Sequence, residues 1–141
     1  MTDEKLCEFA KEAMMKAYAP YSGCFVGAAL LAKSGKVYTG CNIESCAYSP
    51  TNCAERSAFF TAVSQGEREF EKIAVVGGKK GVILDVFPPC GVCRQVMLEF
   101  CDPETFRILM VHRNGMKTRT LAELMPVAFG KTDYCGTKGS E

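Results

Sequence analysis

The sequence predicts an α/β protein, a three-layer α/β/α sandwich around a mixed sheet of roughly five strands. One observation is that apolar runs of strand length alternate along the chain with stretches of helical periodicity. The other is the run KIAVVG at residues 72–77, which is apolar throughout its middle and ends in glycine. A strand with one solvent-exposed face would alternate polar and apolar residues. This run is therefore expected at the centre of a sheet that helices cover on both faces.

The first half of the chain predicts a helix, a hairpin, a loop and a second helix. Thr2 or Asp3 is expected to cap a helix that continues to about Tyr18, and Pro20 ends it. Asn52 or Thr51 is the expected N-cap of the second helix. The remaining elements of this half are a β-hairpin at residues 25–32 and 37–41, a polar irregular loop at 42–50, and the second helix from 53 to about 64, stopped by Gly66.

The second half predicts the rest of the sheet and two more helices. Thr120 is expected to cap a short last helix that reaches Met125, and the Gly-rich tail after Tyr134 is expected to be mobile. The whole chain, residues 1–141, is interpreted as a single domain. Between the central run and the last helix we expect a loop at 77–81, a brief edge segment at 82–87, a helix at about 90–100, a strand at 106–112, a turn at 114–115 and a short return at 116–118.

Composition places the chain among ordinary globular proteins, with 48% hydrophobic and 23% charged residues among 141. A formal net charge of +1 gives no electrostatic case for nucleic acid or a membrane surface as a partner. The start, MTDEKLCEFAKEAM, is charged and amphipathic, and no apolar run is long enough to span a membrane. Nine cysteines are an odd number without a secretory signal, so free thiols in a reducing cytoplasm are expected rather than a disulfide scaffold.

Two short motifs offer ligands for a metal ion. TNCAERSA at residues 51–58 contributes Cys53 and Glu55, and PPCGVCRQ at 88–95 contributes Cys90 and Cys93. Soft thiolates select Zn²⁺ or a similar metal such as iron. A catalytic zinc site typically has three protein ligands and one open position for water. The sequence therefore predicts a metal centre held by these three cysteines, with a carboxylate close to it.

The spacing of the motifs predicts how they meet. Side chains at i and i+2 diverge in mid-helix, but at a first turn Cys53 and Glu55 can converge ahead of the helix axis. Cys90 and Cys93 are three residues apart, on one face of a second helical start. Three thiolates and Zn²⁺ carry a net negative charge, which two helix N-termini would offset. Arg56 or Arg94 would add hydrogen bonds to sulfur, and Arg56 is favoured.

Less specific interpretations of these residues remain open. Cys41 or Cys46 would complete a closed structural zinc site, and a C-x-x-C motif also occurs in redox pairs. Glu55 would then only support the dipole of its helix. The single histidine, His112, falls on a predicted strand far from both motifs and is interpreted as structural.

The stretch CNIESCAYSPTNCAER at 41–56, followed by PPCGVCRQV at 88–96, resembles the small homotetrameric zinc-dependent cytidine deaminases. The similarity runs from about Tyr21 to Phe129. It implies a cytidine deaminase-like fold, one Zn²⁺ per subunit and a homotetramer with active sites shared between subunits. It also implies that a zinc-bound hydroxide converts cytidine, and also 2′-deoxycytidine, to uridine or deoxyuridine plus ammonia in pyrimidine salvage.

The resemblance also implies roles for individual residues. Glu55 would move protons from water to N3 of the base and to the leaving amine. Asn42 and Glu44 would hold the sugar hydroxyls, and the backbone N–H of Ala54 would bind the base. From a neighbouring subunit, Phe129 would stack on the base and Tyr48 would take an intersubunit position.

One segment departs from the family. The family reads Tyr-Ser-x-Phe-Pro-Val-Gly-Ala, whereas this chain has Cys24 and Phe25 where the Phe and Pro stand. Because neighbouring residues on a strand face opposite sides, either the strand entrance is rearranged so that Phe25 still reaches the base, or one stacking wall is lost.

Two rival functions follow from the same residues. One is a related aminopyrimidine nucleoside deaminase of the blasticidin type. The other is a non-catalytic, zinc-stabilised binding module. A nucleoside is favoured over a nucleotide, because no glycine loop that would cradle a phosphate is evident and Lys79 and Lys80 fit a solvated loop.

Overall fold

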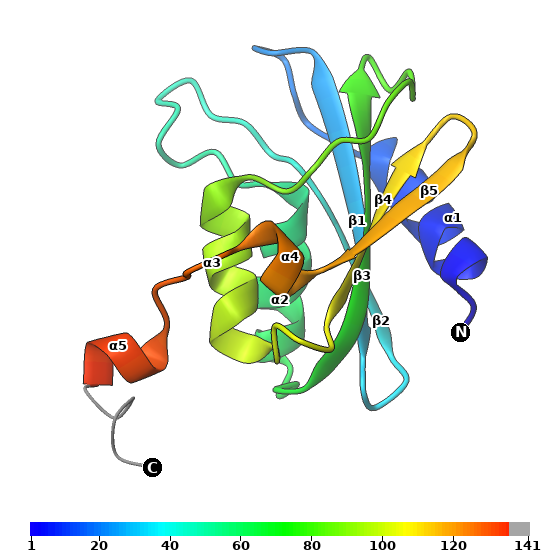
Figure 1. The fold of residues 1–141 in the computed structure, drawn as a ribbon. Coiled ribbons are helices and arrows are strands. Elements are labelled where there is room, and N and C mark those ends of the chain that lie inside the picture. The colour runs from blue at the N-terminus through cyan, green and yellow to red at the C-terminus, as the bar shows by residue number, and fades with distance from the viewer. Residues whose placement is uncertain (136–141) are drawn as a thin grey trace.

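The computed structural model describes residues 1–135, so the tail expected to be mobile lies, beyond Cys135, outside the described residues. Five strands form one sheet in the order β2-β1-β3-β4-β5 (Figure 1). Neighbouring strands are antiparallel except for β3 and β4, which are parallel, so the predicted mixed five-stranded sheet is confirmed. The strands are β1 Cys24–Ala32, β2 Val37–Cys41, β3 Phe70–Lys79, β4 Arg107–His112 and β5 Gly115–Thr120.

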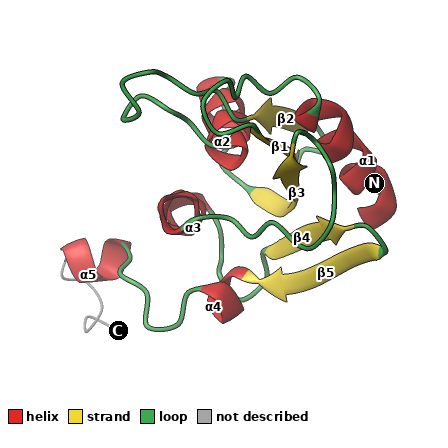
Figure 2. Cartoon of the chain, turned by 90° about the horizontal axis from the view of Figure 1, so that it is seen from above, coloured by secondary structure: helices red, strands yellow, loops and turns green. Residues whose placement is uncertain are grey.

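Helices cover both faces of this sheet. α1 lies on one face, and α2 and α3 lie together on the other, as the view along the layers shows (Figure 2). The predicted three-layer α/β/α arrangement is therefore confirmed. The helices are α1 Asp3–Met14, α2 Ala54–Ser64, α3 Gly91–Phe100, α4 Leu121–Leu124 and α5 Lys131–Cys135.

The central strand β3 separates two hydrophobic cores. Ile73 and Val75 belong to the core under α2 and α3, whereas Ala74 and Val76 belong to the core under α1. All four side chains are completely buried. Alternate residues of a strand face opposite sides, so a strand covered on both sides must be apolar throughout. The apolar run at residues 72–77 therefore lies in the central strand, as predicted.

Helix α1 ends at Met14, earlier than the predicted end near Tyr18. The backbone N–H of Tyr18 donates to the carbonyl of Asn42, and its own carbonyl accepts from the N–H of Glu44. Tyr18 thus pairs with the segment that follows β2 instead of continuing the helix. Helical periodicity persists locally, but a tertiary backbone pairing prevails over it.

The prediction of a loop at residues 77–81 is correct only for Lys80 and Gly81, which form a turn, and the prediction of an edge segment at 82–87 is wrong. Gly77 and Gly78 lie within β3, directly before its last residue, Lys79, and residues 82–87 form no strand. A side chain on Gly78 would overlap the carbonyl of Val82, so the chain folds back closely over the end of β3. These glycines lie in a strand and not in a loop. Because they have no side chain, other atoms can approach the backbone closely there.

The C-terminal third follows the prediction in part. Thr120 caps α4, as expected, and the structure adds a capping box in which Glu123 takes part. The return strand β5 is longer than predicted, because it pairs with β4 along that strand's whole length, and α5 was not predicted. Beyond α4 the chain leads away from the sheet and its covering helices, and the described residues end with α5 (Figure 1).

Candidate metal and substrate site

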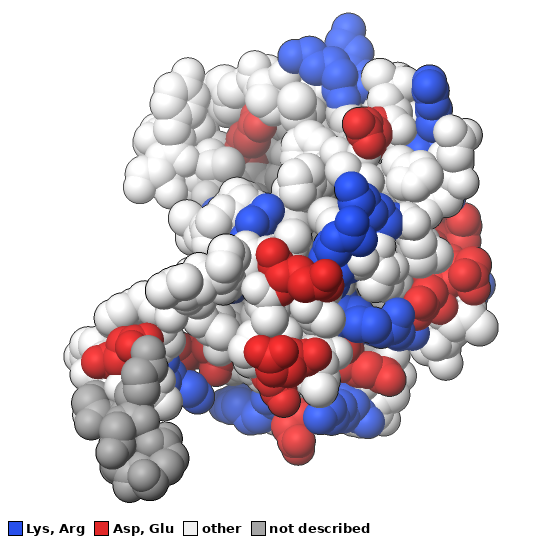
Figure 3. Space-filling view, in the orientation of Figure 1, with Lys and Arg blue, Asp and Glu red and all other residues white. Residues whose placement is uncertain are grey.

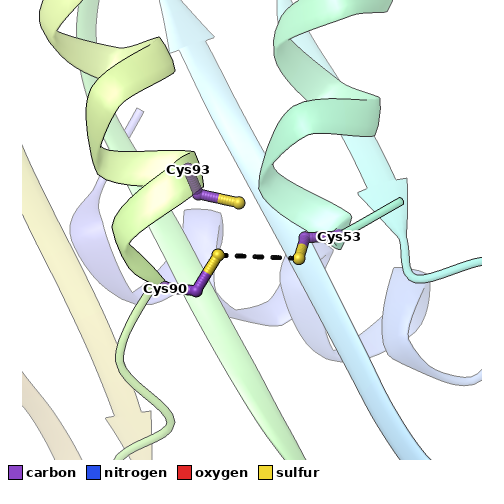
Figure 4. A group of neighbouring side chains, drawn as sticks. All are labelled: Cys53, Cys90 and Cys93. Atoms are coloured by element: carbon purple, nitrogen blue, oxygen red, sulfur yellow. Dashed lines mark hydrogen bonds between the residues drawn. The ribbon is translucent and has the colours of Figure 1, made fainter. Parts of the chain in front are cut away.

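The three predicted cysteines meet at two helix N-termini. Cys53 is the N-cap of α2, Cys90 is the N-cap of α3, and Cys93 lies in the first turn of α3. Their sulfur atoms point toward one another (Figure 4), and the three Sγ atoms lie within 4.8 Å of one another. The distance from Cys53 Sγ to Cys90 Sγ is 3.8 Å.

This geometry fits a zinc ion. A tetrahedral centre with Zn–S bonds of about 2.3 Å requires sulfur atoms about 3.8 Å apart. The Cys53–Cys90 separation of 3.8 Å meets that value. Among residues 1–135, Cys53, Cys90 and Cys93 form a cluster of three that no further histidine, cysteine or carboxylate joins, so Cys41 and Cys46 complete no closed site. One coordination position is therefore left for a non-protein ligand.

The N-cap of α2 differs from the prediction. Cys53 takes this position without a side-chain capping hydrogen bond. Thr51 Oγ1 accepts from the N–H of Ser45, and the backbone of Asn52 pairs with that of Ile43. The two expected capping residues thus hold the preceding loop, while the sulfur of Cys53 stays directed at the cluster.

Hydrogen bonds favour the thiolate form of Cys53. The Cys93 thiol and the Arg56 guanidinium both donate to Cys53, and together they lower the pKa of Cys53 to about 5. Arg56 Nη2 lies 3.2 Å from Cys53 Sγ. Because the Cys93 thiol donates a hydrogen bond to the Cys53 thiolate and is buried, the pKa of Cys93 is raised. The helix N-termini add partial positive charge at the same point.

Arg94 has a different role, although it too adjoins a cysteine. Its Nε donates to the carbonyl of Pro89 and its Nη1 to the carbonyl of Leu124, at 2.9 Å and 2.8 Å. Arg94 therefore ties the entrance of α3 to α4. Of the two arginines, Arg56 is the one that contacts the sulfur cluster, as expected.

Glu55 lies beside the cysteines in a small cavity of about 170 Å³. Its side chain is almost completely buried, with 4% exposed. Burial raises the pKa of Glu55 to about 7. The wall of this cavity, called the inner cavity below, consists of Cys24, Val26, Asn42, Thr51, Asn52, Cys53, Ala54, Glu55, Phe87, Pro88 and Cys90.

A wider cavity of about 370 Å³, the outer cavity, is lined by Tyr21, Ser22, Glu44, Ser45, Tyr48 and Thr51. Thr51 borders both cavities, so they adjoin. Glu44 accepts hydrogen bonds from the N–H groups of Tyr21 and Ser22 and from Ser22 Oγ. These donors hold its carboxylate in place and lower its pKa, with the Ser22 hydroxyl as the largest cause.

Asn42 holds the start of β1 as well as bordering the inner cavity. Its Oδ1 accepts from the N–H of Val26 and its Nδ2 donates to the carbonyl of Cys24, both at 2.8 Å. An asparagine amide has two N–H donors and two acceptor lone pairs. The two bonds use one lone pair and one N–H group, so one lone pair and one N–H group are left for a ligand.

The remaining predicted site residues fall into two groups. Ala54 borders the inner cavity, and as the first residue of α2 its N–H has no partner within the helix. Phe129 lies beyond α4, and Tyr48 lies at the outer cavity; their exposed fractions are 60% and 72%. Neither belongs to the wall of the inner cavity of its own chain.

Phe25 does not reach the inner cavity. It packs against the core under α1, on the opposite face of the sheet, whereas Cys24 faces the cavity. Strand alternation thus decides between the two alternatives: β1 starts regularly at Cys24, and an aromatic wall at this point is absent. We correct the expectation of a substrate contact from Phe25 accordingly.

Other basic and imidazole groups are accounted for locally. His112 Nδ1 accepts from the N–H of Asn114 in the turn between β4 and β5, in keeping with a structural role. Lys79 Nζ donates a hydrogen bond to the carbonyl of Ser22, which links the end of β3 to the segment before β1. On the face in Figure 3, Lys and Arg alternate with Asp and Glu and form no stripe. None of the described helices has the length and apolar character needed to cross a bilayer.

Sequence reasoning missed three residues of the site. Ser22 fixes Glu44, Thr51 borders both cavities, and Phe87 forms part of the inner wall. For Phe87, a signal was present in the two successive glycines, because glycine in a strand marks a place where other atoms approach the backbone closely.

Fold and site together define a class of α/β/α proteins in which a buried carboxylate shares a cavity with a three-thiolate zinc site. The protein-family model for the cytidine and deoxycytidylate deaminase zinc-binding region matches residues 1–109. The chain belongs to this family of zinc-dependent deaminases.

Individual relatives agree with this assignment. The cytidine deaminase of Sporosarcina psychrophila is 50% identical over 133 residues, which cover 94% of this chain and 95% of that protein. The blasticidin-S deaminase of Bacillus cereus is 31% identical over 131 residues, 90% of this chain and 91% of that protein. The crystal structure of cytidine deaminase from Burkholderia pseudomallei superimposes with a TM-score of 0.84 at 45% identity, covering 92% of this chain and 100% of that chain.

Proposed function

We propose that the protein converts cytidine, and also 2′-deoxycytidine, to uridine or deoxyuridine plus ammonia by hydrolysis, in pyrimidine salvage. The observation that carries this proposal is the buried carboxyl of Glu55, which borders the same cavity as Cys53 and Cys90. A carboxyl group beside a three-thiolate centre is suited to moving protons between water and a bound base. Family membership and the close cytidine deaminase relatives support the same reaction.

Cys53, Cys90 and Cys93 would hold one Zn²⁺. When bound, zinc supplies Lewis acidity that lowers the pKa of water to about 7. Glu55 then accepts a proton from the water whose oxygen bonds to C4 of the base, and it delivers this proton to N3. A second proton passes through Glu55 to the amine, which leaves as ammonia when the C4–N4 bond breaks. The C4–O bond remains, so water is consumed and ammonia is released.

The other residues bind and orient the nucleoside. In the inner cavity, the N–H of Ala54 donates to the base. Glu44 accepts from a sugar hydroxyl in the outer cavity, and Asn42 binds the sugar from the wall of the adjoining inner cavity. The backbone N–H groups and the hydroxyl that already hold Glu44 keep its carboxylate ionised and in position for this contact.

We further propose a homotetramer in which Phe129 and Tyr48 complete the site of a neighbouring subunit. Tyr48, Phe129 and the nearby Val127 are all exposed, so their apolar surface is available for a neighbouring subunit to cover. Sedimentation analysis at micromolar concentration is expected to give four times the mass of one chain.

All nine cysteines are free, which suits the reducing cytoplasm, our proposed location.

The test of the reaction follows the ultraviolet spectrum of cytidine mixed with purified protein, before and after treatment with a zinc chelator. We expect conversion that the chelator abolishes and added Zn²⁺ restores. Parallel assays with blasticidin S address the rival substrate, which the Bacillus cereus relative brings into consideration. Turnover of blasticidin S without turnover of cytidine would replace our proposal. Turnover of neither, with zinc bound, would favour a binding module.

A further inference from the structure

The segment at residues 80–89 connects β3 to α3 and passes from one face of the sheet to the other. It begins on the α1 side, where a side chain on Gly81 would lie 3.4 Å from Met15 Sδ and 3.5 Å from Phe25 Cδ2. It ends on the α2 and α3 side, where Phe87 packs against the core of that face. Figure 1 shows this segment running over the end of β3 to the start of α3.

The ring of Phe87 rests on the backbone of Gly77. A Cβ atom at Gly77 would lie 2.8 Å from Cγ, 3.0 Å from Cδ1 and 3.1 Å from Cδ2 of Phe87. Because these three distances are nearly equal, the ring turns a face, not an edge, toward Gly77. Real Cβ atoms do not approach carbon as closely as 2.8 Å, so only glycine at position 77 allows the ring to lie here.

Phe87 is the one aromatic residue in the wall of the inner cavity as formed by the described chain. Cys24, which enters the wall from β1, offers only a short thiol, and the ring of Phe25 lies on the other face of the sheet. A flat heterocycle binds well against an aromatic ring, and this contact is worth a large part of its affinity. Within its own chain, the inner cavity has Phe87 as the source of such a contact.

We propose that Phe87 is the aromatic wall against which the base stacks, and that Gly77 is the positioning residue that holds the ring there. This inference rests on the proposed function, because it takes the inner cavity to be the base pocket. The aromatic contact therefore comes from the entrance of α3 instead of from β1. Loss of the ring weakens binding of the base while leaving the thiolates and Glu55 in place.

The test compares Phe87→Leu, Phe87→Ala and Gly77→Ala with the wild-type holoenzyme. Uridine, the product, is the binding probe in calorimetry, cytidine is the substrate for KM and kcat, and zinc per chain is measured for every variant. We expect about tenfold weaker uridine binding and a comparable rise in KM for Phe87→Ala. A smaller loss is expected for Phe87→Leu, which retains apolar volume, and for Gly77→Ala, in which the ring is displaced. Zinc content should be unchanged.

Two further variants control the interpretation. Leu84→Ala alters an exposed side chain of the same segment, outside both cavities, and should bind uridine as the wild type does. Phe87→Tyr retains the ring and should restore most of the affinity. If the wild type converts cytidine but Phe87→Ala and Phe87→Leu bind uridine within twofold of it, the inference is overturned and the proposed function stands. If the wild type converts no cytidine, the proposed function is overturned, and this inference with it.

Discussion

Arg56 Nη2 donates a hydrogen bond to Cys53 Sγ across 3.2 Å, from the first turn of α2 to the N-cap of the same helix. Arg56 Nε is the buried side-chain polar atom that finds no hydrogen-bond partner among the described residues. Such an orphaned donor costs free energy. The position of the guanidinium is therefore explained by the sulfur cluster, whose negative charge it offsets.

Replacing Arg56 by glutamine should weaken zinc binding by about 10- to 100-fold, because the thiolate of Cys53 loses a charged donor. Competition with a chromogenic chelator measures this affinity. Arg94→Gln is the matched control, since Arg94 contacts backbone carbonyls and not sulfur. It should lower stability with little effect on zinc affinity. Equal zinc affinities for Arg56→Gln and the wild type would show that the hydrogen bond contributes nothing to the metal centre.

Replacing Glu55 by glutamine should lower kcat for cytidine by roughly 10²- to 10⁴-fold, because the amide cannot accept and pass on a proton. The similar shape should leave the zinc content at one per chain. Steady-state assays and metal analysis on the same sample test both points. Glu104→Gln, on the exposed turn before β4, provides a control at the surface. A Glu55→Gln variant with more than a tenth of wild-type kcat would exclude Glu55 as the proton carrier.

Replacing Cys93 by serine should reduce bound zinc to well below one per chain and abolish turnover, because a hydroxyl is a poor ligand for this metal. Cys46→Ser is the matched control. Cys46 belongs to the loop before α2, is exposed, and lies outside the sulfur cluster. Its variant should retain full zinc content. Loss of zinc from Cys46→Ser instead would indicate a closed site with four protein ligands.

Asp3 should make folding sensitive to acid. Hydrogen bonds from Arg107 and Lys72 lower the pKa of Asp3 from its ordinary value of 3.8 to about 2. Because the pKa is lower in the folded state, this stabilisation is complete above pH 3.8 and is lost as the pH falls through about 2. Lys72 is buried, with Nζ at 2.6 Å from Asp3 Oδ1, so the pair also ties β3 to the start of α1.

The Asp3→Asn variant should accordingly be less stable than the wild type by about 2 kcal/mol at pH 6, and by less than about 1 kcal/mol near pH 2.5. Urea unfolding of both proteins at matched zinc content gives these free energies. Glu8→Gln removes the exposed pair with Lys11 and should change stability by only about 0.5 kcal/mol or less. A difference between Asp3→Asn and the wild type that does not depend on pH would refute this assignment.

The sequence by itself determined the mixed sheet, its central strand and the metal ligands. A short apolar run bounded by glycine, such as residues 72–77, favours a strand with two covered faces, and three thiols with this spacing suit one soft metal ion. The N-cap at Thr120 was also predicted, although the reciprocal contact with Glu123 was not. The central run and the N-cap depend on residues that are neighbours in the chain, and the metal ligands were found because each of two motifs carries thiols at a characteristic spacing.

Only the tertiary structure decided which residues border the cavities. The end of α1 depends on the pairing of Tyr18 with Asn42, and the position of Glu44 depends on the N–H groups of Tyr21 and Ser22. The position of the Phe87 ring depends on Gly77, which has no side chain to displace it. Each of these contacts joins segments that are distant in the sequence. Their free energy arises only when the sheet has formed, so no local pattern records them.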